Sequence, residues 1–529
     1  MPVPSLLNHL VEHAAARDGN ACALRANGID FSYAMLAQQV EACAHGLLAL
    51  GVCRGDRVCI FLEKRFEAVV ASFGAAACGA VFVPINPLLK AAQIGHILRD
   101  SGARVLITST FRLAALGTLP PECPALAHTV LVDGDAPGAL PWASFMDAPA
   151  RAMHRVIDSD MAAILYTSGS TGQPKGVVLS HRNMVSGACS VAGYLGNHAG
   201  DTILAALPLS FDAGFSQLTT GFLSGARVVL INYLMARDVV KAMAAERVTG
   251  LTAVPPLYMQ IVQLPWPESI DSHLRYFAST GGRMPRVTLD ALRARAPSAR
   301  PFLMYGLTEA FRATYLPPEQ VDLRPDSIGR AIPNAEVLVL REDGRQCAPG
   351  EVGELVQRGS LVAQGYWNDA AQTAERFRPL PAAAEVNPPG LLRDEIVVFS
   401  GDSVRMDEEG YLYFVGRRDD MIKTSGYRVS PTEIEESLLL TGCVAECVAF
   451  GVEDAGLGQV IAVAVHCTGA PDIDALRAQC RAQLPVYQVP AHFIVFDDAL
   501  PRNPNGKLDR TAIEADACRR LNFSAGMKP

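Results

Sequence analysis

The sequence predicts an α/β protein with a large N-terminal domain and a small, mobile α+β C-terminal domain. From about residue 20 to 380, short apolar segments typical of buried strands alternate with amphipathic segments of helical periodicity. This alternation is typical of parallel sheets covered by helices. A Pro- and Ala-rich stretch near residues 379–390 interrupts it, and strand-like segments up to Val415 then indicate a β-subdomain.

Length and composition limit the class of protein. A chain of 529 residues is longer than one compact core usually supports, so several domains are expected. The formal net charge of −8 argues against a nucleic-acid partner or a polybasic membrane-binding role. The 13 cysteines contain no Cys-x-x-Cys pair, which favours reduced thiols and a cytoplasmic location.

The first predicted helix covers residues 5–16, and no signal peptide precedes it. Helical spacing puts His9 and His13 on one face, in the His-x-x-Glu-His order of some zinc peptidases. Nothing in the sequence indicates a third ligand on a second helix. We therefore interpret this segment as a solvated helix face.

The uncharged segment from Ala68 to Leu89 is long enough to span a bilayer. However, it is rich in Ala and Gly and ends in Val81-Phe-Val-Pro-Ile-Asn-Pro87, where two prolines interrupt any continuous helix. We predict a buried helix followed by a buried strand, and no membrane span.

Further elements follow from periodicity. Strands are predicted at 57–62, 104–108, 161–166, 227–231 and 460–465. Helices are predicted at 34–50, 237–247 and 472–484, and another begins at Ser430-Pro-Thr-Glu433.

A loop rich in glycine and hydroxyl residues follows the predicted strand at 161–166. It reads Tyr166-Thr-Ser-Gly-Ser-Thr-Gly-Gln-Pro-Lys-Gly176. Backbone N–H groups, hydroxyls and a lysine at the end of a strand form an anion-binding loop suited to nucleotide phosphates. The Walker pattern does not fit, because Lys175 is followed by Gly176 and the glycine spacing differs.

This loop resembles the phosphate loop of the adenylate-forming superfamily, which includes acyl-CoA synthetases, adenylation domains of peptide synthetases and beetle luciferases. The resemblance implies a catalytic role for Lys175. It also implies contacts to ATP from the hydroxyl and glycine positions of the loop, namely Thr167, Ser168, Gly169, Ser170, Thr171 and Gly172.

A second motif, Met304-Tyr-Gly-Leu-Thr-Glu309, stands in the order expected for that superfamily. By resemblance, Tyr305 stacks near adenine, Thr308 contacts phosphate and Glu309 holds Mg²⁺. A carboxylate is a suitable hard ligand for this hard cation.

Further motifs follow from residue 399 to residue 428. Asp402 ends Phe399-Ser-Gly-Asp402 and by resemblance binds the ribose, although Ser400 replaces the usual threonine and Val398 the usual aromatic residue. The next motif is Val415-Gly-Arg-Arg-Asp-Asp-Met-Ile-Lys-Thr-Ser-Gly-Tyr-Arg-Val-Ser-Pro431. By resemblance, Arg417 contacts the ribose, Asp419 is the hinge between the domains, and Arg428 contacts the ATP phosphates. The expected division is therefore a large domain at 1–415, a hinge at 416–420 and a small domain at 421–529.

The last motif is Asn503-Pro-Asn-Gly-Lys-Leu-Asp-Arg510. The resemblance makes Lys507 the lysine that grips the substrate carboxylate and the α-phosphate. Pro504 and Gly506 favour the turn that carries it.

Substrate specificity depends on four positions that the resemblance assigns to the acyl pocket: Phe211, Asp212, Gly281 and Arg312. Asp212 follows Phe211 at the place where amino-acid-adenylating relatives carry an aspartate for the substrate ammonium. It could equally cap the following helix. Arg312 could pair with a second substrate carboxylate or with a protein acid. The first interpretation of both residues indicates an amino-dicarboxylic acid.

The resemblance implies an AMP-forming acid–thiol ligase that uses ATP, Mg²⁺ and coenzyme A or the phosphopantetheine of a carrier protein. The sequence ends soon after Lys507, so any carrier protein is expected to be separate. The chain is also similar to stand-alone ligases linked to exosortase loci. Alternatives are an amino-acid-adenylating enzyme that loads a carrier, a luciferase-like oxygenase and a catalytically silent nucleotide-binding regulator.

Overall fold

We describe a computed structural model of the chain. It describes residues 3–117, 123–168, 174–386, 394–417, 420, 422–424, 427–454, 458–484, 488–503 and 506–525. The chain divides into two compact units. The first comprises 1–338, 356–382 and 386–400, and the second comprises 339–355, 383–385 and 401–529.

One sheet of the first unit has the strand order β7-β6-β5-β3-β4-β8-β9. Neighbouring strands are parallel except β8 and β9, which form an antiparallel pair. The strands are β3 (Arg57–Phe61), β4 (Val81–Pro84), β5 (Ala103–Thr108), β6 (His128–Leu131), β7 (Ala139–Pro141), β8 (Met161–Ser168) and β9 (Pro174–Ser180).

A second sheet contributes the order β16-β15-β14-β13-β12-β10-β11-β1-β2 to the first unit. Its central strands, from β14 to β1, are parallel. The strands are β1 (Cys22–Ala26), β2 (Ile29–Ser32), β10 (Thr202–Ala205), β11 (Arg227–Leu230), β12 (Gly250–Ala253), β13 (Tyr276–Ser279), β14 (Arg300–Tyr305), β15 (Thr314–Leu316) and β16 (Ser327–Ala331).

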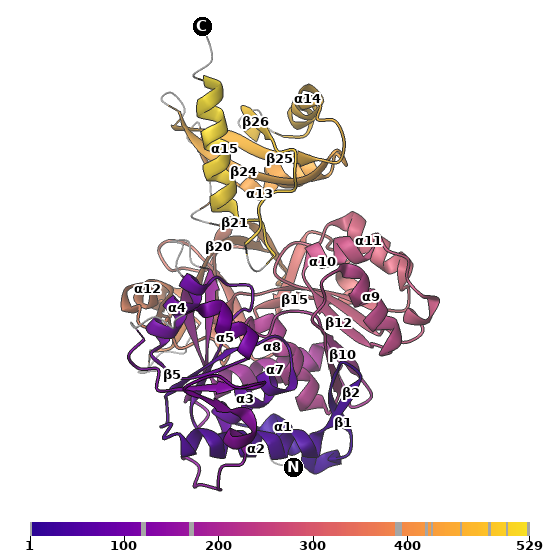
Figure 1. Cartoon of the computed structure of the whole chain (residues 1–529). Coiled ribbons are helices and arrows are strands. Elements are labelled where there is room, and N and C mark those ends of the chain that lie inside the picture. The colour runs from indigo at the N-terminus through magenta and orange to yellow at the C-terminus, as the bar shows by residue number, and fades with distance from the viewer. Residues whose placement is uncertain are drawn as a thin grey trace. The chain divides into compact units, whose positions relative to one another are not determined.

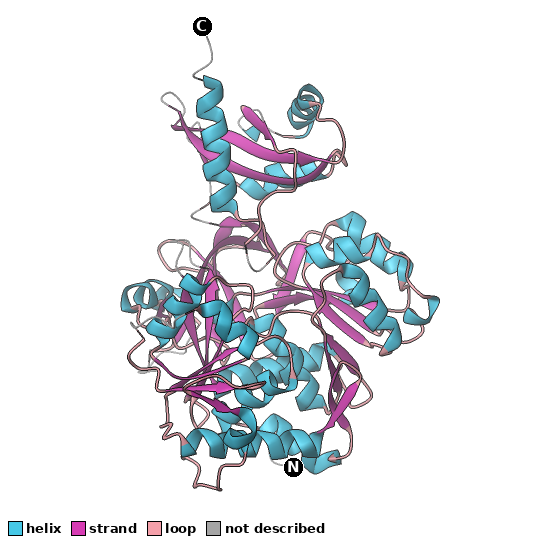
Figure 2. Ribbon diagram, in the orientation of Figure 1, coloured by secondary structure: helices cyan, strands magenta, loops and turns pink. Residues whose placement is uncertain are grey.

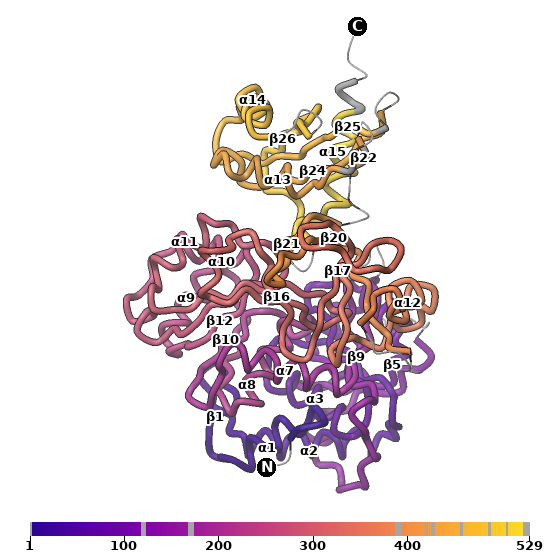
Figure 3. The backbone as a smooth tube through the Cα atoms, turned by 180° about the vertical axis from the view of Figure 1, so that it is seen from behind, coloured from indigo at the N-terminus to yellow at the C-terminus, as the bar shows by residue number. Residues whose placement is uncertain are grey.

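Helices cover these sheets (Figures 1 and 2). The α-helices of the first unit are α1 (His9–Asp18), α2 (Tyr33–Ala49), α3 (Phe66–Ala77), α4 (Ala91–Ser101), α5 (Thr110–Leu116), α6 (Trp142–Met146), α7 (His181–Leu195), α8 (Asp212–Ser224), α9 (Ala236–Ala245), α10 (Pro255–Ile261), α11 (Arg286–Arg295) and α12 (Ala370–Arg376). Short 3₁₀ turns are η1 (Glu268–Ile270), η2 (Thr308–Ala310) and η3 (Pro318–Gln320). The N-terminal helix α1 lies beside α2 in both views of the molecule (Figures 1 and 3).

Aromatic contacts join the two sheets of the first unit through α8. The ring of Phe215 stacks on Phe82 of β4 at 4.8 Å and on Phe73 of α3 at 5.7 Å between centroids. All three side chains are fully buried. Since α8 begins at Asp212, this packing fixes the position of one predicted substrate-binding residue.

The predicted buried helix and strand between Ala68 and Leu89 are confirmed as α3 and β4. Every residue of β4 is buried, which explains the absence of charge. No helix within the described part of the chain is long and apolar enough to cross a membrane.

Four further strands and a short turn link parts of the two units along the chain: β17 (Ala335–Leu340), β18 (Val352–Gly359), β19 (Phe377–Pro379), η4 (Ala382–Ala384) and β20 (Ile396–Met406). The second unit then contains β21 (Leu412–Arg417), β22 (Ile422–Thr424), β23 (Tyr427–Val429), α13 (Pro431–Leu439), β24 (Val444–Asp454), β25 (Gly458–Cys467), α14 (Ile473–Gln483), β26 (His492–Val495) and α15 (Arg510–Ala525). Its sheet has the order β23-β22-β25-β24, and β26 pairs with β25.

The predicted α/β class and the small α+β C-terminal part agree with these elements. Most predicted helices and strands differ from the observed ones by one or two residues. The first helix is the exception, because it begins at His9 rather than at residue 5. The domain boundary predicted at 416–420 stays a prediction, since residues 418–419 lie outside the described part of the chain.

Candidate active site

The two ends of the glycine- and hydroxyl-rich motif lie on the antiparallel strands β8 and β9. Between these strands Thr167 pairs with Lys175, and Tyr166 pairs with Gly176. Residues 169–173, which include the predicted phosphate-binding residues Gly169, Ser170, Thr171 and Gly172, lie outside the described residues, as does the side chain of Ser168.

Lys175 is held by a residue of the short helix α12. Its Nζ donates a hydrogen bond to Oε1 of Gln372 at 2.6 Å. Backbone pairing of β8 with β9 fixes the start of the lysine side chain, and the amide oxygen fixes its end. A single hydrogen bond to a neutral acceptor leaves the ammonium group two further donors for an anion.

Glu309 lies in η2, directly after β14. The hydroxyl of Tyr366 donates a hydrogen bond to Oε1 of Glu309 at 2.7 Å. Burial raises the pKa of Tyr366, and the nearby Glu309 charge adds to the rise. The tyrosine therefore stays a neutral donor that orients the carboxylate.

One extended segment, residues 363–367, connects the lysine strand with the Glu309 turn. Its backbone pairs with β9 through Val178 N to Gly365 O at 3.0 Å and Trp367 N to Gly176 O at 2.7 Å. At its other end, Ala363 N donates to Glu309 O at 2.9 Å. Backbone hydrogen bonds thus connect β9, which carries Lys175, through residues 363–367 to Glu309 within the first unit.

The donor set suits Mg²⁺ bound jointly with phosphates. Magnesium usually keeps several waters and uses one or two carboxylates plus substrate phosphates, rather than a cage of protein ligands. Glu309 supplies one oriented carboxylate, and the described residues contain no cluster of three or more acidic, His or Cys ligands. Glu309 would hold the ion there, and the ion would neutralise phosphate charge.

A strained turn follows Glu309. Phe311 has φ 55° and ψ −47°, and Arg312 N donates to Ala310 O at 2.5 Å, so residues 310–312 form a γ-turn with positive φ. This turn is rare and strained for a residue with a side chain. The fully buried ring of Phe311 packs where Gly187 of α7 leaves space, which holds the turn in place.

The turn directs Arg312 toward Asp212, the first residue of α8. Arg312 Nη1 donates to Asp212 Oδ2 at 2.7 Å, and the two side chains are 3% and 15% exposed. Asp212 does not cap its helix, because Phe211 is the N-cap residue and no side-chain cap bond is present. Arg312 was expected to pair with either a substrate carboxylate or a protein acid. In the structure it pairs with a protein acid, Asp212.

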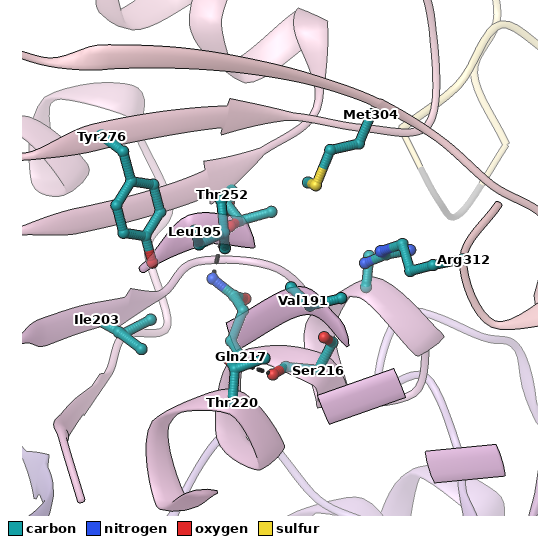
Figure 4. A pocket seen from close by; sticks show the side chains of 11 residues that line it. Val191, Leu195, Ile203, Ser216, Gln217, Thr220, Thr252, Tyr276, Met304 and Arg312 are labelled. Atoms are coloured by element: carbon teal, nitrogen blue, oxygen red, sulfur yellow. Dashed lines mark hydrogen bonds between the residues drawn. The ribbon is translucent and has the colours of Figure 1, made fainter. Parts of the chain in front are cut away.

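A small cavity lies beside this ion pair (Figure 4). Its lining comes from one face of α8, from α7 and from the strands of the second sheet. The lining residues are Val191, Leu195, Ile203, Ala213, Ser216, Gln217, Thr220, Thr252, Tyr276, Met304 and Arg312.

Two other residues predicted for the acyl pocket, Phe211 and Gly281, do not line this cavity. Phe211 precedes α8 and is half-buried. Gly281 follows β13 with φ 78°, a conformation that favours glycine. Tyr305 ends β14 and Thr308 begins η2, so both lie on the same loop as Glu309.

The second unit contains the predicted ribose-binding pair. Asp402 on β20 faces Arg417 on β21 as a cross-strand partner, with 3.4 Å between Asp402 Oδ1 and Arg417 Nε. Asp402 is buried, whereas the Arg417 side chain is 69% exposed. A buried carboxylate beside an exposed arginine can accept hydrogen bonds from vicinal hydroxyls.

Lys507 lies on a turn in the second unit. Asn503 Oδ1 accepts a bond from Lys507 N at 3.1 Å, and Gly506 has φ 77°. Lys507 is exposed. Pro504, the predicted hinge residue Asp419 and the side chain of Arg428 lie outside the described part of the chain, so their predicted roles stay predictions.

Sequence reasoning missed Tyr366 and Gln372. Both residues act through groups that the motifs identified, namely Glu309 and Lys175. The segment Gly365-Tyr366-Trp367 carried one usable signal, a glycine beside two aromatics. Nothing in the sequence pointed to Gln372.

Two family models match the chain. The family model described as "AMP-binding enzyme" matches residues 11–367, and the one described as "AMP-binding enzyme C-terminal domain" matches residues 433–507. The chain belongs to the AMP-binding enzyme family.

Curated relatives include carrier-protein ligases and peptide synthetases. L-proline--[L-prolyl-carrier protein] ligase of Streptomyces coelicolor is 31% identical over 92% of this chain and 92% of its own length. Tyrocidine synthase 3 of Brevibacillus parabrevis is 30% identical over 97% of this chain. The chain spans only 8% of the length of that synthase.

The fold matches solved structures of the same kind. O-succinylbenzoate coenzyme A synthetase of Bacillus subtilis, in complex with ATP and magnesium ion, has a TM-score of 0.81 and 27% identity. The match covers 96% of this chain and 99% of that one.

Proposed function

We propose that this protein is an AMP-forming acid–thiol ligase. It activates a small carboxylic acid with MgATP and transfers the acyl group to the thiol of coenzyme A or of a carrier-protein phosphopantetheine. The observation that carries the proposal is the set of backbone hydrogen bonds that connects β9, which carries Lys175, through residues 363–367 to Glu309. Tyr366 orients the Glu309 carboxylate, and Gln372 holds Lys175. A lysine and a metal-binding carboxylate held together are what transfer of a nucleotidyl group requires.

In the first half-reaction, an oxygen of the substrate carboxylate attacks the α-phosphorus of ATP. The bond to pyrophosphate breaks, and an acyl-adenylate forms. Lys175 neutralises phosphate charge and Glu309 positions Mg²⁺, which supplies charge neutralisation when it is bound. This chemistry depends on positioning and electrostatics more than on proton transfer.

In the second half-reaction, the thiol loses its proton to water and its sulfur attacks the acyl carbon. The bond between the acyl carbon and the phosphate oxygen breaks, and AMP leaves with its electron pair. The proposal includes a hinge at residues 416–420 about which the small domain moves. Lys507 grips the carboxylate and α-phosphate in the first half-reaction, and Asp402 and Arg417 bind the ribose. A single mobile domain can thereby serve both half-reactions.

The acceptor thiol is proposed from relatives of both kinds. The similar proteins include a carrier-protein ligase and a coenzyme A synthetase. We place the enzyme in the cytoplasm, since all thirteen cysteines are free thiols.

Product analysis tests the proposed function. We expect ATP, Mg²⁺ and a suitable acid to give pyrophosphate and AMP, and the acid to support exchange of labelled pyrophosphate into ATP. Formation of ADP and phosphate instead would contradict the proposal and indicate an ATPase.

Lys175→Ala is expected to lower kcat/KM for ATP about 100-fold, since a buried, charge-assisted phosphate contact contributes roughly 2–3 kcal/mol. Lys241→Ala on α9 is the matched control, because this lysine is exposed on a helix away from both motifs. Equal activity of the two variants would remove Lys175 from the phosphate site.

A further inference from the structure

Arg312 has an unused donor inside the cavity beside α8. Arg312 is 2% exposed and lines the cavity, and its Nε has no hydrogen-bond partner among the described residues. Nη1 is already used, because it donates to Asp212 Oδ2 and to Phe311 O. Because a buried donor without a partner costs free energy, a ligand that brings an acceptor to Nε would be favoured.

Gln217 and Tyr276, two other polar residues around the cavity, have protein partners. Gln217 Nε2 donates to Leu204 O at 2.7 Å, and its Oε1 accepts from Leu207 N at 3.2 Å. Tyr276 accepts a bond from Asn197 Nδ2 at 3.0 Å. Among the described lining residues, Arg312 Nε is the fully covered side-chain donor without a hydrogen-bond partner, so it is the donor that gains most from a ligand acceptor.

The charge of Arg312 is already balanced by Asp212. A ligand carboxylate at Nε would give Arg312, Asp212 and the ligand together a net negative charge in a buried site. A ligand ammonium would lie beside the positively charged guanidinium of Arg312. Both cost desolvation energy without full compensation. An uncharged oxygen leaves the group neutral and satisfies the donor.

The cavity is also small. Its volume is about 10 Å³, which is close to the space that one water molecule occupies. Apolar side chains, namely those of Val191, Leu195, Ile203 and Met304, form part of its wall (Figure 4). This space suits one oxygen-bearing carbon at the end of a short chain, not a long hydrocarbon.

We propose that the enzyme selects short carboxylic acids that carry an uncharged hydrogen-bond acceptor, a hydroxyl or keto oxygen, which accepts from Arg312 Nε. This inference rests on the proposed function, because it treats the cavity as the end of the acyl site. Asp212 is then the partner that keeps Arg312 charged and oriented, rather than a ligand for a substrate ammonium.

Binding of non-hydrolysable acyl-adenylate analogues, in which a sulfamate replaces the phosphate, tests the selection without needing catalysis. A matched set carries the pentanoyl group, its 3-hydroxy, 4-hydroxy and 4-oxo derivatives, the 5-amino derivative and glutaryl. Titration calorimetry measures Kd for each analogue. We expect at least one hydroxy or keto analogue to bind about 10- to 100-fold more tightly than the pentanoyl, amino and glutaryl analogues.

Two variants link this preference to Arg312. Arg312→Lys keeps a positive charge beside Asp212 but lacks the Nε–H edge of the guanidinium. The double variant Asp212→Asn with Arg312→Met removes both charges and avoids an unpaired buried ion. Both variants should bind the pentanoyl and oxygen-bearing analogues with Kd values within about threefold of each other. Thr219→Val, on α8 but outside the cavity lining, loses a hydroxyl that bonds Ser216 O and should keep the preference.

Equal binding of the pentanoyl and oxygen-bearing analogues to the unmodified enzyme would overturn the inference. So would tightest binding of the glutaryl or amino analogue, or a preference that survives in both Arg312 variants. Pyrophosphate exchange with the free acids reports separately on the proposed function. Discriminating binding without exchange would refute the ligase activity, whereas exchange without discrimination would refute only the inferred selection.

Discussion

Arg312 and Asp212 form a buried ion pair across the wall of the cavity, with 2.7 Å between Nη1 and Oδ2. Asp212 begins α8, and Arg312 follows the strained turn at Phe311. The two residues that sequence reasoning assigned to opposite ends of a zwitterionic substrate thus bind each other. With the selection that we propose, the expected substrate changes from an amino-dicarboxylic acid to a monocarboxylic acid that carries an uncharged oxygen.

Removing one partner of this pair should destabilise the first unit more than removing both. Asp212→Ala leaves an arginine buried without its counter-ion, for which we expect a loss of about 3–5 kcal/mol in the free energy of unfolding. The double variant Asp212→Asn with Arg312→Met should lose less, because no buried charge is left unpaired. Urea unfolding of the single variants Asp212→Asn and Arg312→Met and of the double variant gives the coupling energy.

A coupling energy near zero would contradict this expectation. Arg341→Ala is the control for a surface pair, since its partner Glu351 and Arg341 itself are each well exposed. Its loss should be at most about 1 kcal/mol.

Gly187 should be intolerant of a side chain because it faces the strained turn. A Cβ at Gly187 would meet Phe311 Cδ1 at 2.3 Å, so Gly187→Ala must displace the ring that holds Arg312 and Glu309 in place. We expect a loss of about 1–3 kcal/mol in stability and a fall in pyrophosphate exchange. Thermal unfolding and the exchange assay measure the two effects.

Gly193→Ala is a control on the same helix, because a Cβ there would meet nothing within 4 Å. Alanine has the higher helix propensity, so this variant should gain about 0.5–1 kcal/mol. If both variants behave alike, contact with Phe311 does not set the tolerance at Gly187.

Tyr366 should set the metal requirement of the enzyme. Tyr366→Phe removes the hydroxyl that orients Glu309 Oε1 and leaves the ring packed against Phe377. We expect the Mg²⁺ concentration for half-maximal exchange to rise about tenfold, while KM for the acid changes little. Tyr413→Phe, which loses a hydroxyl bond to Asp407 in the second unit, should leave the Mg²⁺ dependence unchanged. An unaltered Mg²⁺ titration for Tyr366→Phe would refute the orienting role.

Stability should fall in mild acid because of His181, the first residue of α7. The ring is fully buried, Nδ1 accepts from Leu7 N at 3.1 Å, and burial lowers the pKa from 6.5 to about 4. The unfolded chain therefore binds a proton below pH 6.5 that the folded protein does not take up until about pH 4. Its contribution is complete above pH 6.5 and is lost as the pH falls toward 4.

Between pH 7.5 and 4.5 this loss should be on the order of 2–3 kcal/mol. His181→Asn keeps an acceptor for Leu7 N but does not titrate in this range. The difference in unfolding free energy between the two pH values should therefore shrink by that amount in the variant, as urea unfolding can measure. The same pH dependence in both proteins would exclude His181 as its source.

Much of the fold could be predicted from local sequence. The uncharged segment after Ala68 indicated a buried helix and strand because full burial excludes charge, and α3 and β4 have that form. The glycine-rich motif likewise indicated a turn after a strand. Its backbone and its hydroxyls are local properties of the chain.

The partners of the motif residues could not be predicted in this way. Gln372 reaches Lys175 and Tyr366 reaches Glu309 only because residues 363–367 pair with β9. Pairing between segments so far apart depends on the packing of whole sheets. Neither glutamine nor tyrosine has a sequence pattern that marks such a contact.

The sequence by itself determined the class of the protein and the order of its elements, because motifs and periodicity are local in the chain. It also predicted the residues that carry the chemistry. The tertiary structure decided how two charges, Arg312 and Asp212, are used. A charge in a sequence has no partner until packing brings one near. Once a γ-turn at Phe311 and the start of α8 lie side by side, the ion pair forms, and the open donor on Arg312 is what the cavity offers to a substrate.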